Sequence, residues 1–184
     1  KGKMVYQKSF GYHTYKKKVA VKNHHIYDLA SLTKITATLP LIIEAIGDED
    51  FKLESNLSDL IPELKNTNKA DLTVKAVLSH HAGLTPWIPF FEKTLDRKKK
   101  PKRKYYRDNK KGPYNIEVTD KLFLKKSFKK EMKKLIIESP LMDSIDYKYS
   151  DLPFYIFKDY FERINQKSFD TQVSNKIYNP LGLK

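Results

Sequence analysis

A serine and a lysine stand three residues apart at the start of a predicted helix. Residues 27–34 read YDLASLTK, in which Ser31 and Lys34 have the spacing S-x-x-K. Positions i and i+3 lie on one face of a helix, so the hydroxyl and the amine can meet. A lysine that takes the proton of a neighbouring serine makes that serine a nucleophile. The pair therefore predicts nucleophilic catalysis at Ser31.

The S-x-x-K spacing has little specificity by itself, because a lysine-rich chain matches it by chance. Ser127 and Lys130 match it too, but they fall inside a helix that the sequence predicts over residues 118–137. Ser31 instead opens its helix, where unpaired backbone N–H groups can stabilise an oxyanion. This position favours Ser31 as the nucleophile.

A tyrosine at a predicted loop-to-helix junction can complete the site. Residues 149–151 read YSD, and the phenol of Tyr149 can pass protons between a serine and a leaving group. Residues 106–108 read YRD, but they lie in a basic stretch that we expect to be a loop. We therefore predict Tyr149 as the third catalytic residue.

The remaining candidate residues are those that could bind a substrate, a metal or a cofactor. Trp87 lies in an aromatic stretch, residues 86–91, where it either lines a substrate cleft or packs beneath a loop. The chain has no cysteine, which excludes disulfides, thiolate zinc sites and cysteine nucleophiles. Its five histidines lack the H-E-x-x-H spacing of a helical zinc site. We expect neither a metal nor a cofactor.

The positive charge is concentrated in one stretch. The formal net charge is +14, and residues 93–111 hold eleven lysines and arginines against two aspartates, which is +9 of that total. Such a run can bind nucleic acid, another anionic polymer or anionic lipid. We favour a solvated insertion loop at about residues 92–113, and we expect no nucleic-acid partner because no recognition motif accompanies the run.

The length and apolar content of the chain fit one packed domain. It has 184 residues, of which 40% are hydrophobic. No stretch approaches the roughly 20 apolar residues that a membrane span needs. Residues 1–10 do not resemble a signal peptide.

The apolar patterning predicts a mostly helical α+β fold. Residues 3–21 alternate around a polar turn and predict a β-hairpin. Residues 31–46 predict a helix that bends near Pro40 and is buried over most of its circumference. Thr73 and Gly83 suit the N-cap and the left-handed C-cap of a further helix. Later helices are predicted over residues 118–137, 152–164 and 169–177.

Four stretches together resemble a known family. They are residues 27–34 (YDLASLTK), 72–84 (LTVKAVLSHHAGL), 149–151 (YSD) and 177–183 (IYNPLGL). In order and spacing they are similar to the serine β-lactamase-related superfamily, in its branch of class C β-lactamases, penicillin-binding-protein-like peptidases and esterases. The aromatic stretch and the insertion behind it also resemble the β-lactamase-like domains that some bacteria attach to a family 3 glycoside hydrolase domain.

The resemblance implies a serine hydrolase that forms an acyl-enzyme. Ser31 would attack a small-molecule or cell-wall-derived amide or ester, Lys34 would take its proton, and Tyr149 would protonate the leaving group. We further predict Asp151 as a substrate contact, and Trp87 as another if it lines the cleft. Many relatives have asparagine where this chain has Asp151, and a carboxylate there would favour the charged form of Lys34. The family also implies the periplasm or the cell envelope.

The resemblance further implies part of a β-lactamase/transpeptidase-like fold, with an N-terminal β-hairpin and without the C-terminal sheet strands. The family's third motif, K-T-G or H-x-G on a strand, has no match after Asp151. We therefore expect residues 1–184 to form a single partial domain. Its activity alone would be weak or absent, because a missing oxyanion donor costs roughly 10²–10³ in rate. Unpaired hairpin edges would favour homo-oligomers.

Overall fold

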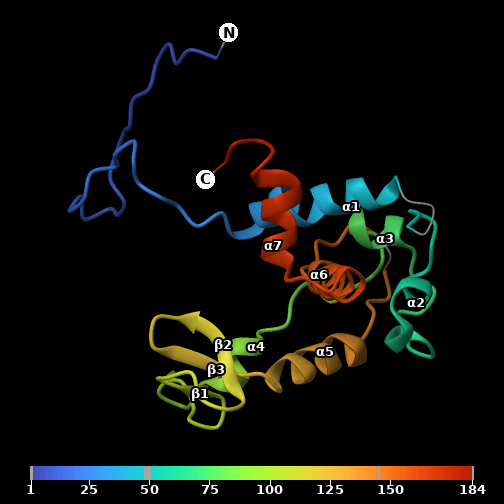
Figure 1. Cartoon of the computed structure of the whole chain (residues 1–184). Helices are drawn as coiled ribbons and strands as arrows, with labels where there is room; N and C mark the ends of the chain where they lie inside the picture. The colour runs from blue at the N-terminus through green and yellow to red at the C-terminus, as the bar shows by residue number, and fades with distance from the viewer. Residues whose placement is uncertain (1, 48–50, 145, 184) are drawn as a thin grey trace.

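The computed structural model describes residues 2–47, 51–144 and 146–183. Its helices form one body with a small antiparallel sheet beside it, and the N-terminal segment extends away from that body (Figure 1). The predicted α+β class is confirmed. Within the described ranges, no helix is long and apolar enough to cross a membrane. The two ends of the predicted domain, Lys1 and Lys184, lie outside these ranges.

The N-terminal hairpin is shorter than predicted. Tyr12 and Ala20 form one antiparallel bridge, beside a hydrogen bond from the His13 N–H to the Val19 carbonyl at 3.0 Å. Residues 2–10 form no strand, and their apolar side chains are exposed. A two-stranded hairpin is marginal in water unless one of its faces packs on another element. The exposed side chains of this segment provide no such packing.

The helix predicted over residues 31–46 is present, but its type changes along its length. It consists of the 3₁₀ turn η1 (Ala30–Leu32), the π-helical segment η2 (Lys34–Thr38) and the α-helix α1 (Leu39–Ile46). The Leu39 N–H bonds the Lys34 carbonyl, five residues back. Pro40 has no N–H, and its ring crowds the carbonyl four residues before it. The structure thus has a wider helical turn before Pro40, and the bend predicted there stays a prediction.

The prediction that this helix is buried over most of its circumference is wrong. Leu41 and Ile42 are buried, whereas Ile35 and Ile43 are 58% and 62% exposed. Helix α6 (Leu152–Asn165) packs against η2, and the π-helical segment η4 (Ser174–Tyr178) packs against α1. These neighbours pack on the side that carries the buried residues of the two segments, which are Ala37, Thr38, Leu41 and Ile42.

Two short helices follow, and side chains cap both of them. In α2 (Leu57–Leu60), Asn56 and Asp59 form a reciprocal capping box. In α3 (Val74–Leu78), the Thr73 hydroxyl accepts the Ala76 N–H at 3.1 Å, which confirms Thr73 as the N-cap.

Gly83 is left-handed, but the prediction that it caps α3 is wrong. The helix ends at Leu78, and His80 supplies the left-handed residue behind it, with φ of +62°. The Gly83 carbonyl accepts the Met142 N–H at 2.7 Å. A Cβ at Gly83 would lie 3.0 Å from the Met142 carbonyl oxygen. Glycine is needed here because two chain segments approach each other closely.

The basic stretch leads into a small sheet. Helix α4 (Phe90–Thr94) precedes it, and β1 (Tyr106–Arg107), β2 (Tyr114–Thr119) and β3 (Leu122–Lys125) pair antiparallel in the order β1-β3-β2. The helix predicted from residue 118 is therefore wrong in its first part, where β2 and β3 form a hairpin. Lys121, with φ of +55°, lies in the turn of that hairpin. Helix α5 (Phe128–Glu138) begins behind it.

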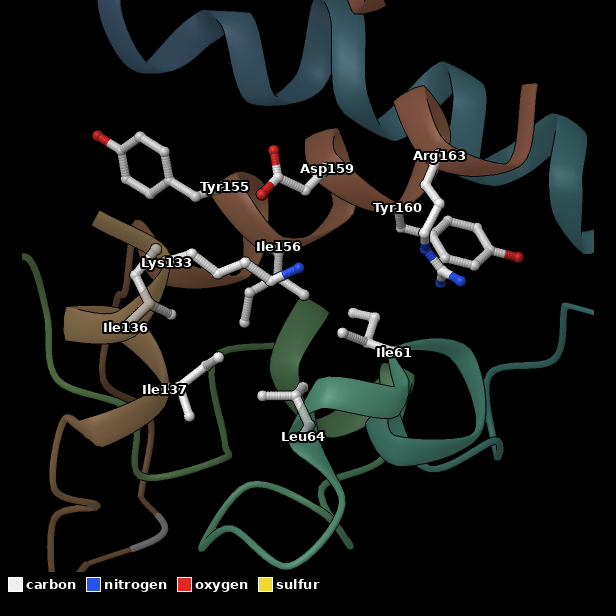
Figure 2. A pocket seen from close by; sticks show the side chains of 10 residues that line it. All are labelled: Ile61, Leu64, Lys133, Ile136, Ile137, Tyr155, Ile156, Asp159, Tyr160 and Arg163. Atoms are coloured by element: carbon white, nitrogen blue, oxygen red, sulfur yellow. The ribbon is translucent and has the colours of Figure 1, made fainter. Parts of the chain in front are cut away.

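The core lies between the helices α1, α2, α3, α5 and α6. Phe51 is buried against the aromatic rings of α6, with ring centroids 5.6 Å apart for Tyr160 and 6.2 Å apart for Phe157. Apolar side chains of η3 (Pro62–Leu64), α5 and α6 line a narrow cavity, together with Lys133 and Arg163 (Figure 2).

A buried lysine connects the segment between α2 and α3 to the end of α5. The Lys69 side chain is fully buried, and its Nζ donates to the carbonyls of Ile137 and Ser139. The last carbonyls of a helix have no partner within the helix, so the amine satisfies groups that would otherwise be buried without one. Burial lowers the pKa of Lys69 to about 8.

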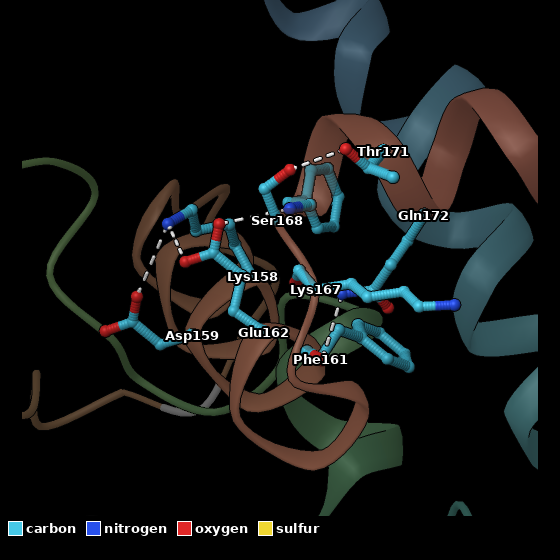
Figure 3. A network of polar contacts seen from close by, with 9 residues as sticks. Lys158, Asp159, Phe161, Glu162, Lys167, Ser168, Thr171 and Gln172 are labelled. Carbon is cyan, nitrogen blue, oxygen red and sulfur yellow. Dashed lines mark hydrogen bonds and ion pairs between the residues drawn. The ribbon is translucent and has the colours of Figure 1, made fainter. Parts of the chain in front are cut away.

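Polar contacts hold helix α7 (Phe169–Val173) against the end of α6 (Figure 3). Glu162 accepts from the Lys158 amine one turn earlier, and its other carboxylate oxygen accepts the Phe169 N–H at 3.1 Å. Gln172 is buried and donates to the Phe161 carbonyl at 3.0 Å. These contacts place Phe169 at the edge of a hollow that contains Ser31.

Candidate active site

The side chains of Ser31 and Lys34 are in contact at the start of the helical segment. The Lys34 Nζ donates a hydrogen bond to the Ser31 Oγ at 3.0 Å. The turn before them is held by Asp28, whose Oδ1 accepts the Ala30 N–H at 2.7 Å. Ala30 has φ of +43°, a left-handed conformation that costs a residue other than glycine about 1 kcal/mol or more. An unfavourable backbone conformation is thus maintained directly before the serine.

Asp151 is the ion-pair partner of Lys34. The Lys34 Nζ lies 2.7 Å from the Asp151 Oδ1, and the two side chains are 14% and 33% exposed. The Asp151 N–H donates to the Pro86 carbonyl at 2.8 Å, which fixes the residue directly before α6. The carboxylate predicted from the sequence as a substrate contact therefore faces the amine of Lys34.

Opposing effects set the pKa of Lys34. Partial burial lowers this pKa, but hydrogen bonding and charge from Asp151 and Tyr149 raise it, and the net pKa lies above the ordinary lysine value. Lys34 is therefore protonated at neutral pH. The amine must lose a proton before it can accept one from the Ser31 hydroxyl.

Tyr149 and Phe154 provide the aromatic surface next to the Lys34 ammonium. The Nζ lies 5.0 Å from the centroid of the Tyr149 ring and 5.3 Å from that of Phe154. Both distances are within the range of a cation–π interaction. Tyr149 is 39% exposed, so a substrate can still reach it. The structure thus brings together Ser31, Lys34, Tyr149 and Asp151.

Residues 149–151 are tied to the segment that contains Trp87. Ser150 is buried, and its Oγ donates to the Thr85 carbonyl at 2.7 Å, beside the bond between Asp151 and Pro86. Trp87 follows Pro86 directly and is 55% exposed. It is not among the residues that line the hollows at Ser31. The role of Trp87 in binding a substrate stays a prediction.

Two adjoining hollows open at the Ser31–Lys34 pair. One has a volume of about 180 Å³ and is bordered by Tyr149, His80 and apolar side chains (Ile35, Leu39, Leu78, Phe154). The other has a volume of about 390 Å³ and is bordered by Asp151, Lys158 and aromatic rings (Phe154, Tyr155, Phe169). Ser31 and Lys34 line both hollows, so the pair is accessible and has apolar walls on either side.

The second S-x-x-K match has no comparable contact. The sequence placed Ser127 inside a helix, which is wrong, because it stands directly before α5. Position at a helix start therefore does not distinguish it from Ser31. Ser127 and Lys130 are joined through their backbones, by the Lys130 N–H and the Ser127 carbonyl. In the other Y-x-D match, the Tyr106 hydroxyl lies 2.9 Å from the Thr94 Oγ1.

His80 belongs to this site, although its residue type and position gave no specific signal. Its ring centroid lies 4.6 Å from that of Tyr149, and its Nδ1 accepts the Ser150 N–H at 3.2 Å. Only the wider motif over residues 72–84 pointed to this part of the chain. Among the residues that the structure describes, no group of three or more His, Asp or Glu side chains is placed to hold a metal ion.

Comparison with known proteins identifies the family of the chain. The family model for Beta-lactamase matches residues 1–184. A curated relative, a β-lactamase of Providencia stuartii, is 25% identical over 187 residues, which are 95% of this chain and 47% of the relative. The chain thus spans about half the length of that relative. Because the family match covers the whole sequence, the chain belongs to the β-lactamase family.

Proposed function

We propose that this chain carries the nucleophilic part of a serine hydrolase that forms an acyl-enzyme with an amide or an ester. The observation that carries the proposal is the hydrogen bond of 3.0 Å between the Lys34 Nζ and the Ser31 Oγ, within a chain of the β-lactamase family. A small acyl compound or a fragment derived from the cell wall is the proposed substrate, and the periplasm or the cell envelope is the proposed location.

The proposed reaction begins at the neutral amine of Lys34. The Ser31 Oγ attacks the carbonyl carbon as its proton passes to the Lys34 Nζ, and the carbonyl oxygen becomes an oxyanion that the Ser31 backbone N–H stabilises. The bond to the leaving group then breaks, and a proton reaches that group through Tyr149. Water would later release the acyl group from Ser31.

Asp151 limits the supply of neutral Lys34. Its carboxylate lies 2.7 Å from the amine and favours the ammonium form. The fraction of chains able to take the serine proton is therefore small at neutral pH and grows as the pH rises. We infer slow acylation, which fits an esterase-like use of the site better than rapid hydrolysis of amides.

The experiment that tests the proposal is covalent labelling of the chain with a fluorescent penicillin and a fluorophosphonate. We expect both probes to label the wild-type chain slowly and the Ser31→Ala variant not at all. Ser127→Ala is the matched control, because it removes the serine of the second S-x-x-K match, and it should label like the wild type. Labelling that persists in Ser31→Ala would remove Ser31 from the mechanism.

The basic stretch supports a second candidate function, which is binding to an anionic polymer. Within residues 93–111, all of which the structure describes, the single ion pair is that of Lys93 with Glu131, at 3.3 Å. Among the residues that the structure describes, no carboxylate lies within ion-pair distance of the other cationic side chains of the stretch. We propose that this unneutralised surface can bind a polyanion independently of Ser31.

A further inference from the structure

His80 contacts the segment of residues 148–150 in three ways. The His80 carbonyl accepts the Lys148 N–H at 2.8 Å. The His80 Nδ1 accepts the Ser150 N–H at 3.2 Å. The His80 ring lies beside the ring of Tyr149, with centroids 4.6 Å apart and planes inclined by 40°. One residue thus holds both neighbours of Tyr149 and its ring.

His80 keeps an unusual backbone conformation in this position. Its φ of +62° is left-handed, which a histidine adopts at a cost of about 1 kcal/mol or more. Glycine would take this conformation without that cost. The choice of histidine therefore has to be explained by its side chain.

We propose that His80 is a positioning residue, which holds Tyr149 and Asp151 against the amine of Lys34. The proposal rests on the proposed function of the Ser31–Lys34 pair. Lys34 and Tyr149 both border the same hollow as His80, so a shift of the tyrosine would change the surroundings of the amine directly. Asp151 follows Ser150, whose N–H is bonded to the imidazole.

The hydrogen bond from Ser150 requires one form of the imidazole. Because Nδ1 is the acceptor, it carries no proton, and the ring is neutral with its proton on Nε2. Burial and the charges of Lys34 and His81 lower the pKa of His80, while the charge of Asp151 raises it, and the net shift is downward. The other titratable side chains near the ring are Tyr147 and Tyr149. The surroundings thus favour the neutral form that can accept from Ser150.

If His80 served only to hold the fold together, its removal would destabilise the whole fold, but other contacts already hold this segment. Ser150 and Asp151 are also held by the carbonyls of Thr85 and Pro86, at 2.7 and 2.8 Å. These bonds keep the segment attached to the body when the imidazole is removed. Loss of His80 should therefore loosen Tyr149 locally and leave the fold intact.

The test compares His80→Gly with His80→Asn. Glycine relieves the left-handed backbone but removes the ring and its acceptor, whereas asparagine tolerates this conformation and offers an oxygen to the Ser150 N–H. His81→Asn is the matched control, because His81 is exposed and its ring contacts Tyr147. The readouts are thermal unfolding and the pKa of Lys34, followed by NMR of labelled lysine and assigned by the loss of its signal in Lys34→Met.

We expect His80→Gly to unfold at a similar temperature to the wild type and to lower the pKa of Lys34 toward its ordinary value. His80→Asn should restore part of the shift, and His81→Asn should not change it. An unchanged pKa of Lys34 in folded His80→Gly, or an equal change in His81→Asn, would overturn the proposal. The pKa measurement needs no acylation, so failure of the Ser31 labelling experiment would be recognised separately.

Discussion

Replacement of Asp151 by asparagine tests the electrostatics of the candidate active site most directly. The substitution keeps the size of the side chain and an oxygen acceptor near Lys34, but it removes the negative charge that lies 2.7 Å from the amine. Without that charge the ammonium form of Lys34 is favoured less. The pKa of Lys34 should therefore fall in Asp151→Asn.

The size of the effect follows from the geometry of the pair. The Asp151 carboxylate favours the ammonium form of Lys34, and solvent screening weakens this preference because Asp151 is 33% exposed. A tenfold change in the neutral fraction corresponds to about 1.4 kcal/mol. At pH 7 we expect about tenfold more neutral Lys34 in Asp151→Asn, and acylation of Ser31 that is faster by a similar factor.

The pH dependence gives a second check on the same pair. Acylation in the wild type should increase with pH up to the raised pKa of Lys34, and the increase should move to lower pH in Asp151→Asn. The contribution of this pair to the stability of the fold changes with pH in the opposite direction. Because the folded pKa is raised, the pair stabilises the fold below the pKa of an unfolded lysine, and this contribution is lost as the pH rises through the folded value.

The assay is the rate of labelling by a fluorescent penicillin between pH 6 and pH 10, on the rising part of the profile, together with the pKa of Lys34 from an NMR titration that continues above pH 10. Asp108→Asn serves as the control, because Asp108 belongs to the second Y-x-D match, in the basic stretch. An unchanged pKa of Lys34 in Asp151→Asn would exclude the carboxylate as the cause of the raised pKa. A lower pKa with slower labelling at every pH would exclude neutral Lys34 as the base.

Two further predictions concern the backbone and the basic stretch. Gly83→Ala should destabilise the fold by about 1–3 kcal/mol in urea unfolding, because φ is positive and a Cβ would lie 3.0 Å from the Met142 carbonyl oxygen. Gly112→Ala is the control and should cost less, because φ is +53° but no atom lies within 4 Å of its Cβ. Equal losses of stability in the two variants would exclude the close approach as the cause. Neutralising the basic residues within 98–104 should weaken binding of the chain to heparin and reduce the salt dependence of that binding. Neutralising the lysines at residues 16–18 is the control and should have neither effect. Equal effects of the two changes would show that only the net charge of the chain matters.

The contacts at the site were predictable from short motifs because those motifs encode local geometry. Ser31 and Lys34 share one turn, so their spacing nearly determines their contact. The approach of Tyr149 and Asp151 to Lys34 spans more than a hundred residues. It was indicated by the Y-x-D triplet at a predicted loop-to-helix junction and by the family resemblance. The contacts that residues 148–150 make with distant parts of the chain, above all with His80, depend on how α3 ends. No periodicity in the sequence reports that feature.

The misplaced helix over residues 118–125 has a specific cause. The apolar residues of β2 and β3, such as Val118, Leu122 and Phe123, fit a helical stripe as well as two short strands. What decides between them is the turn, where Lys121 adopts a left-handed conformation. Aspartate and lysine, unlike Asn-Gly or Asp-Gly, are a weak turn signal. The same error placed Ser127 inside a helix and made it look different from Ser31.

The partial exposure of α1 changes the explanation of how Ser31 is held. Patterning predicted a helix buried over most of its circumference, which would hold Ser31 through packing, but Ile43 is 62% exposed and the turn before α1 is π-helical. The restraints on Ser31 are instead local and polar. They are the Asp28 carboxylate on the Ala30 N–H and the Lys34 amine, which Asp151 anchors in turn. The position of the nucleophile therefore depends on the charge state of Lys34, and a change of pH that alters the base also alters the support of the serine.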